Sequence, residues 1–258
     1  MAFVSGPLFP IYGYKNVKNV MLAQPRQSDG PMVVAALNDP RVYMNLNGPP
    51  YPYTEKDWEE WYLFVSHAAR ECSKEYQVID EELGDQGRDP KERECQRKRL
   101  IMQSMWPLTI RIEPELLRDR LRSESAFIGT ITPQRSIFLY ILDEDERQRR
   151  KQENDGLAAG DPKIIWEVGF YLIPDYHGRG IMPAVLRTVI KDVLIQYMNA
   201  HIVEATYFEH NSSSKRVLEK CGFRFVQLVP DAIALPPTKT NGVTGRKVGL
   251  GVMRWQGA

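Results

Sequence analysis

Two stretches of the chain repeat apolar positions at helical spacing. After Thr54, which has Asp57 nearby as a capping partner, apolar residues recur at three- and four-residue steps through Trp58, Trp61, Tyr62, Val65, Ala69 and Cys72. A second stripe begins after Gly180 and predicts a helix with one fully apolar face. The members of that face are Met182, Val185, Leu186, Val189, Ile190, Val193, Leu194 and Tyr197.

Two shorter helices are predicted from the residues at their ends. In "SDGPMVVAALNDP", Asp29 is placed to cap a helix that has Pro31 in its first turn and Pro40 beyond its end. In "NSSSKRVLEKCGF", Asn211 begins a helix that Gly222 ends in the C′ position.

Runs of β-branched and aromatic residues predict the strands. We place strands at residues 16–24, in "WPLTIRIE", "SAFIGTITP" and "SIFLYILDE", at 164–173 and 201–208, and in a closing antiparallel pair, "RFVQLVPDAIAL" and "RKVGLGVMRW". Gly169, inside 164–173, marks a bulge or the close approach of something to the backbone. Because strands and helices alternate only in places, we expect an α+β architecture with one central sheet in a single domain, 1–258.

Charged residues dominate two segments. Residues 73–104 predict a solvated helical excursion or an insertion, and residues 143–163 predict a long polar loop. Acids and bases are interspersed and the formal net charge is +1, so nothing favours a nucleic-acid partner. The basic cluster "RKRL" at 97–100 is too short to favour a nuclear location, which it leaves open beside a cytoplasmic one.

The remaining composition narrows the class of protein. Cys72, Cys95 and Cys221 have no paired spacing, which favours a reducing compartment. No apolar run is long enough to cross a bilayer, and the N-terminal segment has no basic stretch before an apolar core, so we expect neither a membrane span nor a secretory signal. The four histidines and three cysteines have no metal-ligand spacing, so we expect no metal. The histidines are His67, His177, His201 and His210.

The segment "GFYLIPDYHGRGIMPAVLRTVI" places two glycines between a strand and a helix, where backbone N–H groups can bind a phosphate. A Walker loop is excluded, because Ile181 and Met182 stand where Lys and Ser or Thr are needed. A dinucleotide fingerprint is disfavoured, because Pro183 occupies its third small position and no acidic residue follows at the expected place.

Three blocks together resemble one family. "GFYLIPDYHGRGIMPAVL", "NSSSKRVLEKCGFR" and the upstream "LNDPRVYMNLNGPPYPYTEKDWEEW" resemble the GCN5-related N-acetyltransferases (GNAT), in particular the branch typified by the ribosomal-protein N-terminal acetyltransferases RimJ and RimL. The resemblance implies a central mixed, mostly antiparallel, twisted sheet flanked by helices, with both charged segments as insertions. It also implies that acetyl-coenzyme A (acetyl-CoA) is the cosubstrate.

The resemblance assigns candidate cosubstrate-binding residues. The pyrophosphate would lie on the loop that begins with His177, in the position of a usual Gln or Arg, and ends with Met182, in the position of a usual small residue. Between them lie Gly178, Arg179, Gly180 and Ile181, and Arg179 adds a positive charge. Asn211 resembles the residue that contacts the pantetheine arm, and capping a helix is compatible with that role. The backbone of Phe170, Tyr171 and Leu172 is implied to stabilise the oxyanion.

Two side chains are candidate catalytic groups. Glu167 lies on the strand that the resemblance places beside the thioester, and burial near Trp166 would raise its pKa toward that of a general base. A carboxylate on a solvated face, or paired with an arginine, remains the alternative. For the acid, the resemblance implies either a Tyr late in the helix or, in the RimL-like branch, a Ser in its first turn. Leu218 occupies the Tyr position, and Ser214 matches the Ser of the Asn-x-x-Ser pattern, so its hydroxyl would protonate or hydrogen-bond the thiolate. Binding the free N–H groups of its own helix is the alternative for Ser214.

The acceptor is less defined than the cosubstrate. The resemblance places it against "NLNGPPYPYT" and "LPPTKTNGVTGRKVG", where Tyr51, Tyr53 and Trp58 could line a pocket. Neither loop carries a charge signature for a polyamine or a nucleic acid. We therefore expect direct acetyl transfer to a primary amine, a protein N-terminus or a small molecule, and leave a homodimer open. The alternative is a non-catalytic module that binds acyl-CoA.

Overall fold

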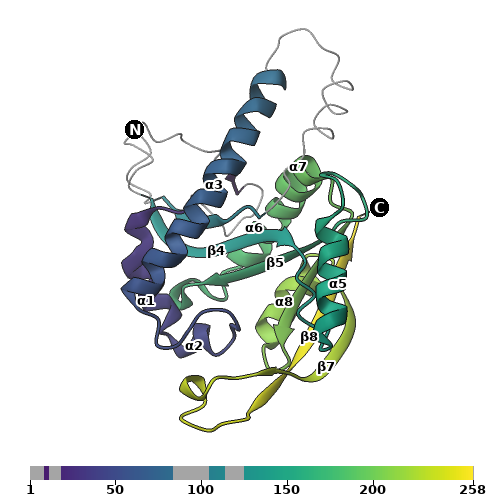
Figure 1. The fold of residues 1–258 in the computed structure, drawn as a ribbon. Coiled ribbons are helices and arrows are strands. Elements are labelled where there is room, and N and C mark those ends of the chain that lie inside the picture. The colour runs from purple at the N-terminus through teal and green to yellow at the C-terminus, as the bar shows by residue number, and fades with distance from the viewer. Residues whose placement is uncertain (1–8, 12–18, 84–104, 114–124, 258) are drawn as a thin grey trace.

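The computed structural model describes residues 9–11, 19–83, 105–113 and 125–257. These residues form one sheet of eight strands in the order β1-β2-β3-β4-β5-β6-β8-β7 (Figure 1). Neighbouring strands are antiparallel except β5 and β6, which are parallel. The α+β architecture and the mixed, mostly antiparallel sheet expected from the sequence are confirmed. The strands are β1 (Phe9–Pro10), β2 (Val20–Ala23), β3 (Leu108–Ile112), β4 (Ala126–Arg135), β5 (Ile165–Leu172), β6 (Ile202–Phe208), β7 (Arg224–Ala234) and β8 (Lys247–Gln256).

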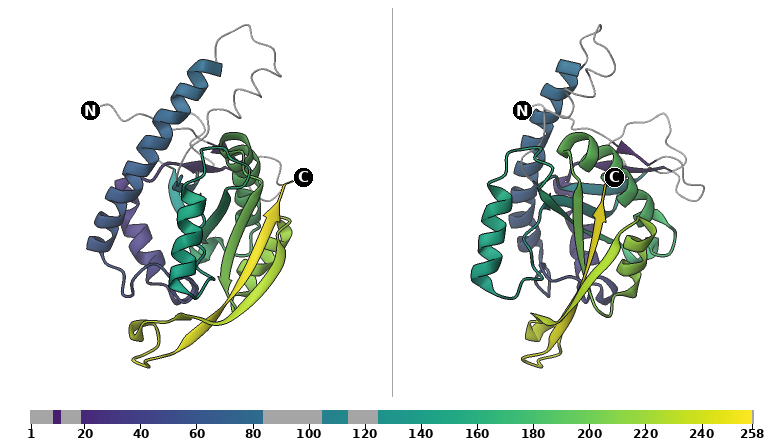
Figure 2. Two further views of the ribbon diagram at one scale, coloured as in Figure 1. Left: turned by 45° about the vertical axis from the view of Figure 1, so that its right-hand side comes forward. Right: turned by 90° about the vertical axis from the view of Figure 1, so that its right-hand side faces the viewer.

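Helices cover both faces of this sheet (Figure 2). One face carries α1 (Gly30–Leu37), α3 (Glu55–Leu83) and α5 (Glu144–Asp155), and the other carries α6 (Ile181–Thr188), α7 (Gln196–Met198) and α8 (Ser212–Lys220). A π-helical segment, η4 (Val189–Ile195), joins α6 to α7 without a break in the helix. The remaining short elements are η1 (Gln27–Asp29), α2 (Pro40–Tyr43), η3 (Pro174–Tyr176) and η5 (Pro237–Lys239).

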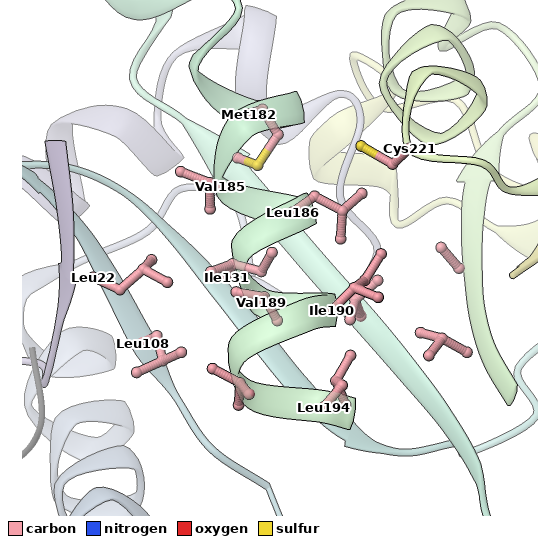
Figure 3. Close-up of a cluster of buried hydrophobic side chains, with 14 of the residues drawn as sticks. Leu22, Leu108, Ile131, Met182, Val185, Leu186, Val189, Ile190, Leu194 and Cys221 are labelled. Carbon is pink, nitrogen blue, oxygen red and sulfur yellow. The ribbon is translucent and has the colours of Figure 1, made fainter. Parts of the chain in front are cut away.

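The largest core lies between the sheet and the helical run from α6 to α7 (Figure 3). All eight apolar positions of the predicted stripe, Met182 to Tyr197, are buried. They pack on inward-facing side chains of the strands, among them Leu22, Leu108 and Ile131. Burying such a face stabilises the fold by about 1.5–3 kcal/mol for each large side chain, so this helix start is fixed rigidly against the sheet.

The predicted ends of three helices are confirmed. Asp57 donates its backbone N–H to Thr54 Oγ1 and accepts the Thr54 N–H, which is a reciprocal cap of α3. Gly222 follows α8 with φ +87. Pro40 lies beyond α1 but also begins the short helix α2. Helix α3 runs on to Leu83, so the first part of the charged segment is helical. Residues 16–18, 84–104, Cys95 and the 97–100 cluster lie outside the described residues.

Two sequence expectations between β4 and β5 are wrong. "SIFLYILDE" forms no strand, because β4 already ends at Arg135 and Phe138 turns the chain with φ +53. The predicted polar loop contains helix α5, which Asp143 caps by accepting the Glu146 N–H at 2.8 Å. Exposed ion pairs three and four residues apart support this helix in place of an apolar face. They include Arg149 with Glu146 and Glu153, and Lys151 with Asp155.

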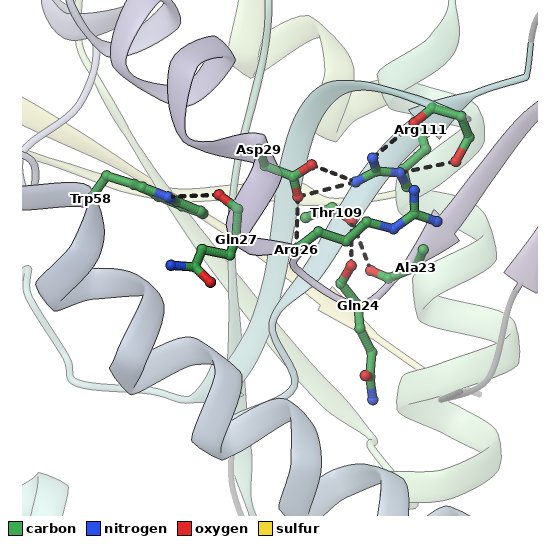
Figure 4. A network of polar contacts seen from close by, with 9 residues as sticks. Ala23, Gln24, Arg26, Gln27, Asp29, Trp58, Thr109 and Arg111 are labelled. Atoms are coloured by element: carbon green, nitrogen blue, oxygen red, sulfur yellow. Dashed lines mark hydrogen bonds and ion pairs between the residues drawn. The ribbon is translucent and has the colours of Figure 1, made fainter. Parts of the chain in front are cut away.

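A buried ion pair fixes α1 to the sheet (Figure 4). The Arg111 guanidinium on β3 donates to the Asp29 carboxylate at 2.8 and 3.0 Å, and both side chains are at most 4% exposed. Asp29 therefore precedes α1 as predicted, while its carboxylate binds Arg111 and the Arg26 N–H instead of capping that helix. Next to this pair, Trp58 Nε1 donates to the Gln27 carbonyl at 3.2 Å, which ties α3 to the same corner.

Two further observations bear on the sequence expectations. In the described part of the chain, Cys72 and Cys221 are free and buried. Across the same residues, we find no helix with the length and apolar character that a bilayer span requires.

Candidate active site between two separating strands

Strands β5 and β6 separate in the middle of the sheet. They pair only from Ile165 to Glu167, after which β6 continues beside β8 and β5 stays beside β4. Ile173 N–H donates to the Ile128 carbonyl, and antiparallel pairing alternates, so the backbone groups of Phe170 and Leu172 point away from β4 into the gap. The Tyr171 N–H is directed to β4 by the same alternation.

A cavity of about 360 Å³ opens on this gap, and we call it the cradle cavity. Its walls are β5, the loop before α6, the first turns of α8, and α2. Four of its lining residues are basic, whereas the described residues that line it include no carboxylate. The basic residues are Arg41, His177, Arg216 and Lys220. A polyanion therefore matches the charge of this cavity.

The two loop glycines have a conformation that other residues avoid. Gly178 has φ +72 and Gly180 has φ +77, and a Cβ at either position would have no atom within 4 Å. The space over the loop is open, and the first N–H groups of α6 have no partner within the helix, which leaves them for an external anion. The loop therefore fits the diphosphate of a coenzyme A.

The other residues of this loop divide between the cavity and the core. Met182 lines the cradle cavity, but its side chain is buried and packs in the core. The side chain of Ile181 is buried as well. His177 is exposed and its Nε2 lies 2.9 Å from the Leu172 carbonyl, which makes the ring part of the loop structure. Arg179 lies over the Tyr176 ring at 5.2 Å.

Asn211 and Ser214 stand at the opposite wall of the cradle cavity. Asn211 Oδ1 accepts the Ser214 N–H at 3.0 Å, and Asn211 Nδ2 donates to Ser214 Oγ at 3.2 Å. A hydroxyl that accepts in this way keeps its own proton for another acceptor. The capping role of Asn211 and a donor role of Ser214 are therefore compatible.

A second cavity, of about 540 Å³, lies on the α1–α3 face, and we call it the aromatic cavity. It meets the cradle cavity at Leu46, Phe170 and Tyr171, which line both. Lys239, in the loop between β7 and β8, donates to the Leu46 carbonyl at 2.8 Å. The two loops expected to flank the acceptor are thus in contact. Tyr53 and Trp58 line the aromatic cavity, whereas Tyr51 stacks on Tyr43 outside it.

Glu167 lies two residues before Gly169, which lines the aromatic cavity, and does not itself line either cavity. Its carboxylate accepts Gln134 Nε2 at 2.6 Å, and Ser136 Oγ and the Ile137 N–H at 3.1 Å. Burial raises the pKa of Glu167, while these hydrogen bonds oppose the rise. Among the described residues no arginine forms an ion pair with Glu167, and its carboxylate is hydrogen-bonded instead of free in solvent.

The sequence reasoning missed the cationic lining of the cradle cavity. Arg41 follows α2's N-cap residue Asp39, with which it pairs at 2.6 Å, and Arg216 and Lys220 lie on α8. Arg216 is two residues beyond Ser214, so the α8 block carried the signal. For Arg41 the sequence held no such signal, because only the fold brings α2 to this cavity. In the described ranges, no group of three or more His, Cys, Asp or Glu side chains could hold a metal ion.

Among curated proteins, a relative matches this chain over a short region. A probable N-acetyltransferase of Bacillus subtilis, YjcK, is 36% identical over 76 residues. This match covers 30% of the chain and 39% of the relative's length.

Solved structures share the fold over nearly the whole chain. Mycobacterium smegmatis RimJ in complex with a CoA-disulfide has a TM-score of 0.54 at 15% identity and covers 92% of this chain and 81% of its own. Spermidine N-acetyltransferase from Vibrio cholerae, in complex with CoA and spermine, has a TM-score of 0.55 at 12% identity, with coverages of 93% and 95%. The family model of the GNAT acetyltransferase domain matches residues 19–224. The chain therefore belongs to the GCN5-related acetyltransferase (GNAT) family.

Proposed function

We propose that this chain transfers the acetyl group of acetyl-CoA directly to a primary amine, either a protein N-terminus or a small molecule. The observation that carries the proposal is the junction of the two cavities at Phe170 and Tyr171, beside the gap between β5 and β6. One cavity is lined by cations and suits the cosubstrate, and the other approaches the same stretch of β5 from the opposite face. Such a junction brings two substrates together, and proximity supplies much of the acceleration.

The cosubstrate would be held mainly by the backbone. The N–H groups from Gly178 to Met182 would bind the diphosphate at the start of α6, with Arg179 supplying charge. Arg216 and Lys220 line the cradle cavity and would bind the phosphate of coenzyme A that is not part of the diphosphate. The pantetheine arm would run beside β5 toward Asn211, and the free backbone groups of Phe170 and Leu172 would bind it and the oxyanion.

Proton transfer would involve one group from each side of the junction. The attacking amine loses a proton, which we assign to Glu167 through an intervening water, because Glu167 lies two residues before Gly169, which lines the aromatic cavity. The C–S bond breaks as the amide forms. The Ser214 hydroxyl, whose proton is not used by Asn211, would hydrogen-bond the departing thiolate.

Calorimetric titration with acetyl-CoA tests the first half of this proposal, and thiol release in the presence of amines tests the second. We expect saturable binding of acetyl-CoA that Gly180→Asp abolishes, because the introduced Asp carboxylate would then occupy the place of the diphosphate. Thiol release should depend on added amine. Binding without amine-dependent release from a broad amine panel would instead make the chain an acyl-CoA-binding module.

A further inference from the structure

The aromatic cavity has a wall composition that restricts its ligand. Six aromatic side chains line it, and the charged side chains that line it are the carboxylates of Asp57 and Glu60. Among the described residues that line it, none is Lys, Arg or His. The aromatic side chains are Tyr53, Trp58, Trp61, Phe127, Phe170 and Tyr171. The cradle cavity has the opposite charge pattern, so the two cavities suit ligands of opposite charge.

Both carboxylates come from the same side of α3. The Asp57 carboxylate accepts the Thr54 N–H at 2.7 Å, and hydrogen bonds from Thr54 hold the pKa of Asp57 below its usual range. Glu60 follows one helical turn later and lies 3.7 Å from Lys56, with both side chains largely exposed. An exposed pair of this kind is weak. The mouth of the cavity therefore keeps negative charge, which attracts an ammonium group and repels an anion.

Gly169 opens the end of this cavity next to the junction. The pairing of β4 and β5 has no register shift at Gly169, so this glycine does not form a bulge. A Cβ built there would have no atom within 4 Å, and the residue lines the aromatic cavity beside Phe170. Of the two sequence interpretations, the approach of a ligand to the backbone fits, because the missing side chain leaves room there.

We propose that the acceptor is a primary amine that carries an apolar group of aromatic size and no anionic group. This inference rests on the proposed function and names the substrate class of its second site. An arylalkylamine and a polypeptide with a large apolar first residue share this chemistry. A free amino acid would place its carboxylate in a cavity without a cation, near two carboxylates, at the cost of uncompensated desolvation.

A panel of five amines tests the class. We would measure kcat/KM by thiol release with 2-phenylethylamine, L-phenylalanine, n-propylamine, spermidine and the tripeptide amide Phe-Gly-Gly-NH2. We expect 2-phenylethylamine to exceed n-propylamine, which lacks the ring, by on the order of tenfold to a hundredfold. It should exceed L-phenylalanine by at least about tenfold, although its amine is the more strongly protonated. Preference for the tripeptide amide over 2-phenylethylamine would identify the source as a polypeptide.

Two substitutions on α3 form a matched pair. Glu60→Lys places a cation in the cavity wall and should lower kcat/KM for 2-phenylethylamine while raising it for L-phenylalanine. Glu59→Lys is the control, because Glu59 is an exposed neighbour with the same charge that does not line the cavity. Equal effects of the two substitutions would contradict the inference.

Gly169→Val tests the same cavity by steric blocking. It should raise KM for 2-phenylethylamine by about tenfold or more and affect n-propylamine less, with the affinity for acetyl-CoA unchanged. Titration of 2-phenylethylamine into the CoA-saturated protein gives a readout that does not depend on turnover. Best turnover with spermidine or L-phenylalanine would overturn this inference alone. Absence of thiol release with every amine would overturn the proposed function and this inference with it.

Discussion

Asn211 holds Ser214 at the wall of the cradle cavity through two hydrogen bonds. Its carbonyl oxygen accepts the Ser214 backbone N–H at 3.0 Å, and its amide nitrogen donates to the Ser214 hydroxyl oxygen at 3.2 Å. The first bond caps α8 and the second orients the hydroxyl. A single local motif thus begins the helix and positions a donor at the site where the proposed leaving group departs.

Replacing Ser214 by Ala is expected to lower kcat by about a hundredfold, because the thiolate loses its donor. The affinity for acetyl-CoA should change little, since Asn211 still accepts the N–H of residue 214 and caps α8. Steady-state kinetics together with calorimetry separate the two effects. Ser66→Ala, on α3 and away from both cavities, serves as the control. A Ser214→Ala variant with unchanged kcat would leave the residue only its part in the cap.

Replacing Glu167 by Gln is expected to lower kcat/KM by on the order of a hundredfold or more and to remove the acidic limb of its pH profile. In the native enzyme that limb should lie above the ordinary pKa of a glutamate, because burial raises the pKa of Glu167. Initial rates measured across pH at limiting amine give the profile. An identical acidic limb in both proteins would exclude Glu167 as the base.

The same raised pKa has a consequence for stability. The folded state holds the Glu167 proton more tightly than the unfolded state, so the free energy of unfolding should fall as the pH rises from the unfolded-state pKa through the folded-state pKa. Urea denaturation of the wild-type protein and of Glu167→Gln over this window should show the fall only in the wild type. A parallel fall in both would assign it to other groups.

The region between β4 and β5 shows why part of the fold could not be read from the sequence. "SIFLYILDE" has strand composition. However, the Asn154 side chain of α5 binds both the backbone N–H and the carbonyl of Ile165 at 2.9 Å, and so occupies part of the edge of β5. Helix α5 has no apolar stripe, and its evidence lay in Asp143 as N-cap and in charge pairs at helical spacing. Hydrophobic periodicity could not detect it. The helix from Met182 onward was predictable because its stripe is continuous and buried.

The site was predictable only where chemistry requires a particular residue. Gly178 and Gly180 could be found because a positive φ strongly favours glycine. The backbone N–H groups that face the gap could not be predicted, because they depend on the register of β5 with β4. The residue types at Phe170 and Leu172 do not encode that register. The aromatic cavity likewise arises from side chains on α1, α3, β4 and β5 that only the fold brings together.

Gly180→Ala should weaken acetyl-CoA binding strongly, because the new residue is strained at φ +77 by about 1–2 kcal/mol and the loop relaxes away from the cradle geometry. Gly245→Ala is a matched control. Gly245 has φ +76 and open space around a Cβ, so the strain is the same, but it lies in the β7–β8 loop and lines neither cavity. Calorimetry should therefore separate two variants of similar stability. Equal loss of binding in both would place the pyrophosphate elsewhere.

The buried pair of Asp29 and Arg111 ties the start of α1 to β3, and both elements contribute residues to the lining of the aromatic cavity. Asp29 directly precedes α1, and Gly30 approaches Trp58 so closely that a Cβ there would lie 2.6 Å from the indole ring. Asp29→Asn leaves the Arg111 charge buried without its carboxylate and is expected to cost about 3–5 kcal/mol of unfolding free energy. Because α1 then loses its anchor, Trp58 should shift and KM for the amine should rise more than KM for acetyl-CoA.

A double-mutant cycle tests whether the pair itself carries this effect. Arg111→Met alone leaves the Asp29 carboxylate buried without its cation, whereas Asp29→Asn combined with Arg111→Met leaves neither charge, so the double change should cost less than the sum of the two single changes. Urea denaturation gives the coupling free energy, and KM for 2-phenylethylamine gives the functional coupling. Additive costs would mean that Arg111 acts chiefly through Ser125, whose carbonyl it binds at 2.8 Å and whose hydroxyl it binds at 3.1 Å. In that case α1 would be held by the packing of Val33 and Leu37, and the amine KM should remain that of the wild type.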